Sequence, residues 1–217
     1  MITKYGYDVF FTIAGICIAL ILVALFLIEP RTVKYSIIAV ALLFFGFTAN
    51  FFRDPDRTPP SGDALVLSPA DGKVIVVQQA EENEFLKAPA YQISIFMSPL
   101  NVHVNRNPIS GQVAHYRYIP GEYFAAFEDK ASEKNEHTVI GMENHKGKVL
   151  FKQIAGFVAR RIVCTLKVGD TVKAGDRFGM IKFGSRVDVF VPASATPKVR
   201  PGDRAVAGET ILAELPD

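Results

Sequence analysis

Two long uncharged segments dominate the hydrophobic pattern near the N-terminus. The first runs from Val9 to Ile28, which is 20 residues, and Asp8 and Glu29 bound it. At 1.5 Å per residue a helix of this length covers about 30 Å, the thickness of the hydrocarbon core of a bilayer. The second segment covers residues 35–52, and the polar sequence EPRTVK separates the two. The pattern predicts a transmembrane helical hairpin over residues 1–52, with helices at 9–28 and 35–52.

A cleaved signal peptide is disfavoured, because the first segment is too long, lacks a small-residue cleavage site and is followed directly by a second span. A shallow hairpin that does not cross the bilayer stays open. The flanking cations give the sidedness: Lys4, Arg53 and Arg57 lie on one side of the hairpin, and Arg31 and Lys34 lie on the other. The excess of three cations over two favours a cytoplasmic position for both ends of the hairpin. The downstream domain would therefore lie on the cytoplasmic side of the cell membrane.

After the hairpin, the pattern changes to short strands. Prolines and charges in RDPDRTPPSGD predict a linker at 53–63. From residue 64 to 217 the chain alternates β-branched or aromatic runs with turn residues, and residues 121–135 are the exception that suits a short helix or a loop. The expected strands are LVLSP, KVIVVQQ, YQISIFMS, GQVAHYRYI, HTVIGMEN, GKVLFKQIAG, RIVCTLKV, GMIKFGS and RVDVFVP. We therefore expect a mainly β domain.

An internal repeat refines this fold class. GDTVKAGDRFGMI starts at Gly169 and GDRAVAGETILAE starts at Gly202, an offset of 33 residues. Both match Gly-Asp-x-x-x-Ala-Gly-[Asp/Glu], in which the glycines suit tight turns. Such units recur in barrel-sandwich, lipoyl-like folds, and SPADGKV at 68–74 resembles another turn of that architecture.

Composition excludes several classes of protein. The chain has 217 residues, 49% of them hydrophobic, with 24 Lys and Arg against 22 Asp and Glu. This balance excludes a disordered chain and gives no charge field for nucleic acid. Two cysteines, Cys17 and Cys164, do not make a disulfide scaffold and suit a reducing compartment. No HExxH or CxxC spacing is present, so we expect no metal.

One short segment near the C-terminus carries candidate chemistry. KFGSRVDVF, residues 182–190, places Gly184 and Ser185 between two expected strands. A Gly-Ser pair alone is usually a simple hairpin turn. Here Asp71, in PADGKV, and His103, in SPLNVHVNRNP, supply a carboxylate and a base that could serve a serine nucleophile. There is no GxSxG elbow, which disfavours an α/β-hydrolase.

Six ordered segments together resemble one known family over essentially the full length. They are FFRDPDRTPP, SPADGKV, FMSPLNVHVNR with NP after it, KASEKNE, QIAGFVARRIV and KFGSRVDVF. The chain resembles the phosphatidylserine decarboxylase proenzymes of the short, membrane-hairpin type. The resemblance implies a zymogen of phospholipid biosynthesis that acts on phosphatidylserine at a lipid bilayer and makes phosphatidylethanolamine. It also implies a homodimer.

The resemblance further implies that the chain cuts itself between residues 184 and 185, so that fragments 1–184 and 185–217 form a heterodimer. The catalytic residues would be Ser185, His103 and Asp71. Ser185 would attack the carbonyl carbon of Gly184, His103 would be the base, and Asp71 would orient the imidazole. The cofactor would be a covalent pyruvoyl group derived from Ser185, which provides an electron sink for decarboxylation. His103 would also protonate the product carbanion.

Arg106 stands where longer relatives have a second histidine, so one histidine would serve both steps, or another group would take one of them. Arg106 could instead bind the substrate carboxylate or phosphate, as could Arg160 and Arg161. The alternatives are a surface arginine for Arg106 and a solvated pair for the other two. His137 stands where relatives often have arginine, and its role stays open.

Two further features have a structural alternative. His115 suits a strand position better than a catalytic role. The aromatic segment at 122–134 suits either the bilayer interface or core packing.

Two other functions remain as alternatives. One is a decarboxylase of another serine-headgroup lipid, such as an ether lipid or archaetidylserine. The other is a non-enzymatic, membrane-anchored barrel-sandwich adaptor.

Overall fold

The computed structural model describes residues 1–121, 134–156, 161–182 and 185–216. It divides into two compact units, Met1–Pro55 and Asp56–Asp217. The predicted linker at 53–63 therefore straddles the division, and most of it packs on the second unit. The two units differ in which side chains they bury.

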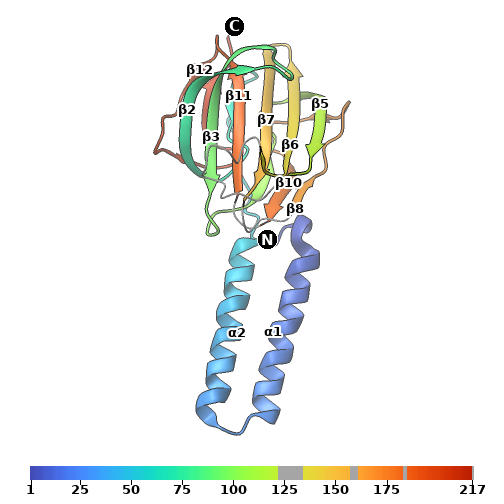
Figure 1. Cartoon of the computed structure of the whole chain (residues 1–217), viewed down its shortest axis with the longest axis vertical. Coiled ribbons are helices and arrows are strands. Elements are labelled where there is room, and N and C mark those ends of the chain that lie inside the picture. Colours follow the sequence, from blue (N-terminus) through green and yellow to red (C-terminus); the bar gives the residue numbers. More distant parts are fainter. Residues whose placement is uncertain (122–133, 157–160, 183–184, 217) are drawn as a thin grey trace. The chain divides into compact units, whose positions relative to one another are not determined.

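The first unit is a hairpin of two long helices, α1 (Tyr7–Leu27) and α2 (Arg31–Phe51), preceded by a short 3₁₀ turn, η1 (Lys4–Gly6) (Figure 1). Both helices are long and apolar enough to cross a membrane, with mean hydropathies of 2.9 and 1.7. Their large apolar side chains are exposed, as Phe26 at 79% and Leu43 at 75% illustrate. Helices of a soluble core would bury these side chains, so the exposure fits a lipid environment.

Small residues form the contact between the two helices. Cys17, Ala24 and Ala41 are buried there, at 2%, 0% and 3% exposure. Small side chains let helix backbones approach closely where no water drives association. At the open end, Thr3 N–H donates to the Phe52 carbonyl (2.9 Å) and Asp54 N–H donates to the Met1 carbonyl (2.7 Å), which ties the two ends of the unit together.

The second helix begins four residues before the predicted start. Pro30 occupies the cap position, where its fixed φ suits a helix entry and its missing N–H costs nothing. Lys34, in the first turn, donates from Nζ to the Leu25 carbonyl at 3.2 Å. This bond gives a partner to a carbonyl at the end of the first helix. Because Lys34 can reach that carbonyl, its charge is tolerated inside the second helix.

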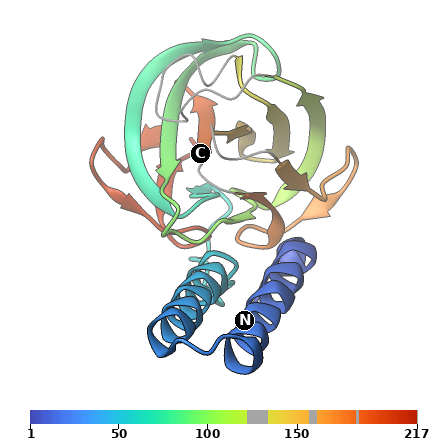
Figure 2. The same ribbon diagram turned by 60° about the horizontal axis from the view of Figure 1, so that its bottom comes forward.

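The second unit is built of antiparallel strands, most of them where the sequence predicts them. The long strands form an eight-stranded sheet with the order β13-β2-β3-β11-β7-β6-β5-β9, which curls around the core (Figures 1 and 2). Two three-stranded sheets, β1-β14-β12 and β4-β10-β8, complete the unit. The strands are β1 (Leu65–Leu67), β2 (Gly72–Glu82), β3 (Ala88–Met97), β4 (Val104–Arg106), β5 (Gly111–Ile119), β6 (His137–Asn144), β7 (Gly147–Ala155), β8 (Arg161–Cys164), β9 (Thr171–Val172), β10 (Arg177–Lys182), β11 (Ser185–Pro192), β12 (Thr196–Pro197), β13 (Arg204–Ala205) and β14 (Ile211–Glu214).

This arrangement has an internal twofold pseudosymmetry. Half A contains β1, β2, β3, β11, β12, β13 and β14, and half B contains β4, β5, β6, β7, β8, β9 and β10. Leu67 N–H donates to the Pro108 carbonyl (2.8 Å), and reciprocally Arg106 N–H donates to the Pro69 carbonyl (3.0 Å). Both β2 and β5 break register two residues after an initial glycine, at Val74 and Val113. The predicted barrel-sandwich fold is therefore confirmed in detail.

The predicted repeat caps both edges of the large sheet. In the first copy the Gly169 N–H donates to the Val113 carbonyl, and in the second the Gly202 N–H donates to the Val74 carbonyl, both at 2.8 Å. Both glycines have positive φ, +97° and +103°, which a side chain would disfavour. The short strands β9 and β13 inside the two copies then pair with β5 and β2.

Half B is inserted within half A. The chain leaves half A after β3, builds the whole of half B, and returns at β11, which pairs with β3 and β7. In half B the equivalent strands, β6 and β7, are joined by a short turn at Asn144–Gly147. Ser185 is therefore the residue at which the chain re-enters half A.

The largest hydrophobic cluster of the described residues fills the space between the sheets. Its buried side chains include Ile95, Phe151, Phe178 and Val189. Cys164 of β8 packs against this core, and burial raises the pKa of its thiol from 9.0 to about 11.

We predict that Cys164 resists alkylation in the folded protein. In a Cys17→Ser chain, iodoacetamide at pH 8.5 should label it about 100-fold more slowly than after unfolding in guanidinium, because the thiolate fraction is smaller. Mass spectrometry of timed samples measures the rate. Equal rates in both states would contradict the burial of this thiol.

Candidate active site

The register of the strands brings five segments that are distant in the sequence to one end of the eight-stranded sheet. Ser185, the first residue of β11, pairs with Met97 on one side and with Ala155 on the other. Gly72 begins β2 one residue before the pair formed by Lys73 and Phe96. On the far side, Ala155 N–H donates to the Glu136 carbonyl at 2.9 Å. This row joins SPADGKV, FMSP, the Gly-Ser segment, QIAG and NEH, which are widely separated in the sequence.

Ser185 is fully buried within this row. Its hydroxyl donates to the Met97 thioether sulfur at 3.1 Å. A thioether is a weak acceptor, so the hydroxyl is held without a strong competing bond. Because Val187 and Val189 belong to the core, alternation along β11 turns Ser185 toward the same side. The residues before it, 183–184, lie outside the described residues, and Gly184 with them.

His103 is fully buried between the end of β3 and the start of β4. Its Nδ1 lies 3.0 Å from the carbonyl oxygen of Asn101. A carbonyl only accepts, so Nδ1 carries the proton and Nε2 carries the lone pair of the neutral ring. The His103 carbonyl also accepts from the Ile181 N–H at 3.4 Å, four residues before Ser185. The structure therefore places an imidazole beside the strand that leads to Ser185, with Nδ1 rather than Nε2 at the Asn101 carbonyl; its role as a base stays a prediction.

Asp71 has a structural task in addition to the predicted one. Its Oδ1 accepts from the Ala207 N–H at 2.8 Å. In half B, Ser110 occupies the equivalent position and its hydroxyl accepts from the Ala174 N–H at 3.0 Å. The carboxylate thus repeats a bond that a hydroxyl makes elsewhere, and it also binds Arg57 at 2.9 Å through Oδ2. The orienting role of Asp71 toward His103 stays a prediction.

The three arginines proposed for substrate binding occupy different environments. Arg106 is 4% exposed, and its Nη1 donates to the Gly175 carbonyl at 2.8 Å, so it is buried between the two repeats and is not the surface arginine of the alternative interpretation. Arg161 opens β8 and is exposed, opposite Lys182 of β10. Arg160 lies outside the described residues, as does the aromatic segment up to residue 133. A substrate contact for any of the three stays a prediction.

A chain of buried amides supports the site, and sequence reasoning missed it. Asn105 Nδ2 donates to the Pro69 carbonyl (3.2 Å), Gln153 Nε2 donates to Asn105 Oδ1 (2.9 Å), and Thr138 Oγ1 donates to Gln153 Oε1 (2.9 Å). A fully satisfied buried network fixes the relative positions of its strands. Here it joins β4, which follows His103, to β7, which pairs with Ser185. The only signal in the sequence is that polar residues interrupt apolar strands.

The opposite face of β11 carries a buried ion pair. Arg186 Nε donates to Asp188 Oδ1 at 2.6 Å, and Arg186 Nη2 donates to Ser94 Oγ at 2.9 Å. Arg186 is 2% exposed and Asp188 is 0% exposed. Breaking such a pair would leave an uncompensated buried charge. The pair therefore fixes the start of β11 directly after Ser185.

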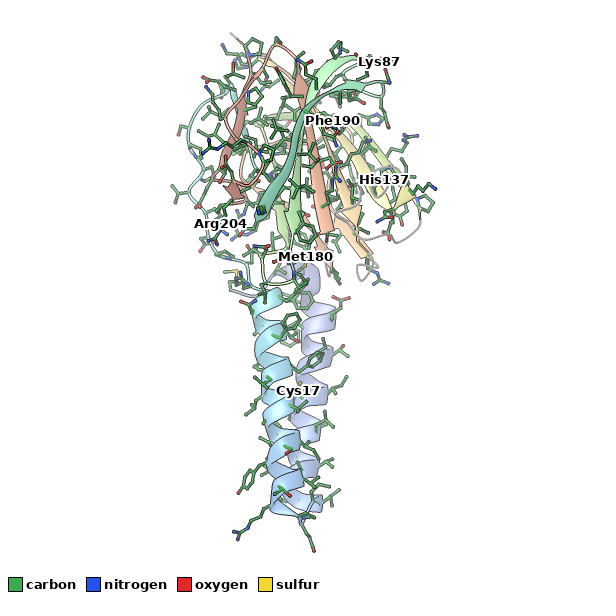
Figure 3. The ribbon with its side chains drawn as sticks, turned by 60° about the vertical axis from the view of Figure 1, so that its left-hand side comes forward. Cys17, Lys87, His137, Met180, Phe190 and Arg204 are labelled. Atoms are coloured by element: carbon green, nitrogen blue, oxygen red, sulfur yellow. The ribbon has the colours of Figure 1, made fainter. Side chains whose placement is uncertain are left out.

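His137, labelled in Figure 3, begins β6 and pairs with Ile154. Ile154 precedes Ala155, the partner of Ser185, so His137 and Ser185 lie at the same end of the sheet. Its Nδ1 is 2.6 Å from the Asn135 carbonyl, and the ring is 5% exposed. Burial lowers the pKa of His137 below its usual value of 6.5, despite the bond to Asn135. His137 is therefore neutral at neutral pH.

His115 lies elsewhere. Its Nε2 is 2.9 Å from Glu84, away from this row. Within the ranges that the structure describes, no group of three His, Cys, Asp or Glu side chains suits a metal ion.

Comparison with known proteins assigns the family. The family model for phosphatidylserine decarboxylase matches residues 44–213. The chain belongs to the phosphatidylserine decarboxylase family, and it is an enzyme, a decarboxylase.

Three relatives share the name phosphatidylserine decarboxylase proenzyme. The relative from Pelodictyon phaeoclathratiforme is 48% identical over 98% of this chain and 99% of its own length. That from Chlorobium chlorochromatii is 46% identical, again over 98% and 99%. The protein from Prosthecochloris aestuarii is 42% identical over 100% of this chain and 99% of its own.

We predict that Asp71→Ser separates the structural role of Asp71 from its predicted catalytic role. Serine supplies an acceptor for Ala207, as Ser110 does for Ala174, so the fold should lose no more than about 2 kcal/mol. Self-cleavage, seen on a denaturing gel, should slow by about 100-fold or more, because the carboxylate is gone. The control, Ser110→Ala, should lose similar stability and be cut normally. Full-rate cutting of Asp71→Ser would leave Asp71 a structural residue only.

We also predict a pH dependence of stability from His137. The pKa of His137 in the folded state is below 6.5, its value in the unfolded chain. The contribution of His137 to the free energy of unfolding is therefore fully present above pH 6.5 and is lost as pH falls through the lowered pKa. Each unit of lowering corresponds to about 1.4 kcal/mol. His137→Gln should therefore lose less stability between pH 7.5 and pH 5 than the unmodified chain, measured by circular dichroism in detergent. His145→Gln, at a side chain 66% exposed, is the control and should show no such change.

If His137→Gln and the unmodified chain lose the same stability over this range, burial does not hold His137 neutral.

Proposed function

We propose that the protein decarboxylates phosphatidylserine to phosphatidylethanolamine, using a pyruvoyl group that it makes from Ser185. The observation that carries this proposal is the buried position of Ser185, between Met97 and Ala155 at the end of the sheet where the other family segments meet. The names of the relatives supply the substrate. The hairpin of apolar helices supports a lipid substrate, since it would hold the enzyme at the bilayer that contains it.

Self-cleavage begins with the Ser185 hydroxyl. Its oxygen attacks the carbonyl carbon of Gly184, the bond from that carbon to the Ser185 nitrogen breaks, and an ester replaces the amide. Removal of the Ser185 α-proton then expels the Gly184 carboxylate, which ends fragment 1–184. Water hydrolyses the remaining dehydroalanine and releases ammonia, so fragment 185–217 begins with a pyruvoyl group.

His103 is suited to the proton transfers of this sequence. The bond from Nδ1–H to the Asn101 carbonyl leaves Nε2 as the basic nitrogen. Burial of both His103 and Ser185 excludes water, which strengthens the electrostatic effect of nearby groups on the reaction. Asp71, two strands away from Ser185, would stabilise the imidazolium that forms.

The residues present fit a pyruvoyl group at this position. Ser185 is the first residue of its strand and is fully buried, so the group would lie at a strand end inside a closed site. When formed, it supplies an electron sink for the carbon–carbon cleavage. His103 would hold the proton that the product carbon receives, and Arg106, Arg160 or Arg161 would bind the anionic substrate.

The two fragments would stay together after the cut. Fragment 185–217 contains β11, a central strand of the large sheet, and β14, the centre of a three-stranded sheet. Losing it would break the pairing of β11 with both β3 and β7, so separation would require unfolding. We further propose a homodimer, with the β unit on the cytoplasmic side of the cell membrane.

We predict that the unmodified chain runs on a denaturing gel as two pieces, of residues 1–184 and 185–217, that copurify under native conditions. Ser185→Ala should remain one chain and release no carbon dioxide from phosphatidylserine. His103→Ala should be cut at least about 100-fold more slowly, because the base is lost.

Met180→Leu, in β10, the strand that precedes β11 in the chain, is the control and should be cut normally. An unmodified chain that stays whole yet releases carbon dioxide would contradict the self-cleavage step.

A further inference from the structure

A small basic pocket lies beside the active-site row, on the outer side of β2 and β3. It has a volume of about 410 Å³ and is lined by Gly72, Lys73, Phe96, Ser98, Asn101, Gly202 and Arg204. Lys73 and Arg204 pair directly across β2 and β13, so their side chains lie on one face. Figure 3 shows Arg204 toward the same end of the unit as Met180, and Lys87 at the other end.

The predicted catalytic residues lie within one or two links of the lining of this pocket, although Ser185 and Met97 face the core and the pocket lies on the outer side of the sheet. Gly72 follows Asp71 in the chain. Phe96 precedes Met97, the hydrogen-bond partner of Ser185. The Asn101 carbonyl accepts from His103 Nδ1. Two strand spacings, about 10 Å, separate β2 from β11, and the long side chain of Lys73 can cover part of that span.

The pocket has the chemistry of an anion site. Lys73 and Arg204 are exposed, and over the ranges described neither has an acidic partner. The nearest carboxylate in sequence, Asp203, accepts from the Arg200 N–H at 3.0 Å. Asn101 Oδ1 accepts from both N–H and Oγ–H of Ser98, at 2.8 Å each, which leaves Nδ2 as the donor of this amide. Ammonium, guanidinium and amide donors together match a phosphate.

The internal pseudosymmetry shows that this charge is a local feature of half A. The pair in half B equivalent to Lys73 and Arg204 is Gln112 and Thr171, which carries no charge. The two pairs share their backbone setting, next to an initial glycine and a capping repeat. A structural requirement of the fold would apply to both copies, whereas the cations occur only in half A, the half that the chain re-enters at Ser185.

We propose that Lys73 and Arg204, with the Asn101 amide, bind the phosphodiester of the serine-headgroup substrate. This inference rests on the function proposed above. In such a substrate only an ester oxygen and one methylene separate the phosphorus from the reacting α-carbon, so a phosphate site must adjoin the Ser185 row. The pocket would set the distance between the headgroup and the reacting residue.

The test exchanges the two cations for the residues of the other half, Lys73→Gln with Arg204→Thr. In the full-length chain carrying Ser185→Ala, in detergent, calorimetry with glycerophosphoserine measures binding without requiring any cleavage or turnover. We expect the dissociation constant to rise roughly tenfold or more. The control double variant, Lys87→Asn with Lys167→Gln, removes the same charge elsewhere and should bind as the parent does. Asn tolerates the positive φ of Lys87, +53°.

The second measurement uses the chain with Ser185 intact. The exchanged variant should cut itself normally and should decarboxylate short-chain phosphatidylserine with a KM raised about tenfold and a kcat close to the parent's. Unchanged binding of glycerophosphoserine and an unchanged KM would overturn the proposal. An effect confined to vesicles of anionic lipid would overturn it too, because the cations would then bind a bilayer surface.

Inorganic phosphate tests whether the pocket binds a free phosphate ion instead of a lipid headgroup. Binding of phosphate that glycerophosphoserine does not displace would overturn the headgroup assignment in favour of a free-anion site. If the unmodified chain neither cuts itself nor decarboxylates, the proposed function fails. The calorimetry with Ser185→Ala still decides whether the pocket binds a phosphodiester.

Discussion

The pairing that holds Ser185 between Met97 and Ala155 is the constraint on which the site depends. The proposed self-cleavage requires one hydroxyl to be placed against a particular peptide bond, and a loop would not restrict it enough. Here the residue begins a central strand that is paired on both sides and followed by the buried pair of Arg186 and Asp188. The rigidity that the proposed self-cleavage requires thus begins at the serine itself.

The differences between the two similar halves of the β unit indicate where the functional candidates lie. The repeats at Gly169 and Gly202 make the same backbone bonds, so they are devices of the fold. Functional candidates lie where the halves differ. Asp71 replaces the hydroxyl of Ser110, Lys73 replaces Gln112, and half A has the return at Ser185 where half B has a simple turn. A duplicated barrel can keep one copy as scaffold and use the other for chemistry.

The strands and the helical hairpin were predictable because their signals are local. Alternation and turn residues gave nine of the strand segments, and uncharged length gave both helices. The short strands β4, β9, β12, β13 and β14 were missed, because runs of two to four residues carry too little periodicity and form only through partners distant in sequence.

The start of the second helix was misplaced because the charges of Arg31 and Lys34 concealed it, although Pro30 marks a helix entry.

The sequence identified the candidate residues of the site, but it did not reveal most of the contacts that hold them in place. The family segments identified Ser185, His103 and Asp71. The Met97 contact of the serine, the Asn101 carbonyl that sets the tautomer of His103, and the Ala207 bond of Asp71 depend on register and on the pseudosymmetry. Comparing SPADG with NPISG would have shown from sequence that Asp71 also has a structural counterpart. The amide chain through Gln153 has no such signal.

The mass of the small fragment tests the central claim most directly. If the hydroxyl of Ser185 is consumed to make a ketone, the C-terminal piece must be lighter, by the mass of one ammonia molecule, than a peptide of residues 185–217 that begins with serine. Reduction with borohydride should then add two hydrogen atoms to it. A fragment with the full mass of the serine peptide, or one that begins at a different residue, would contradict the account.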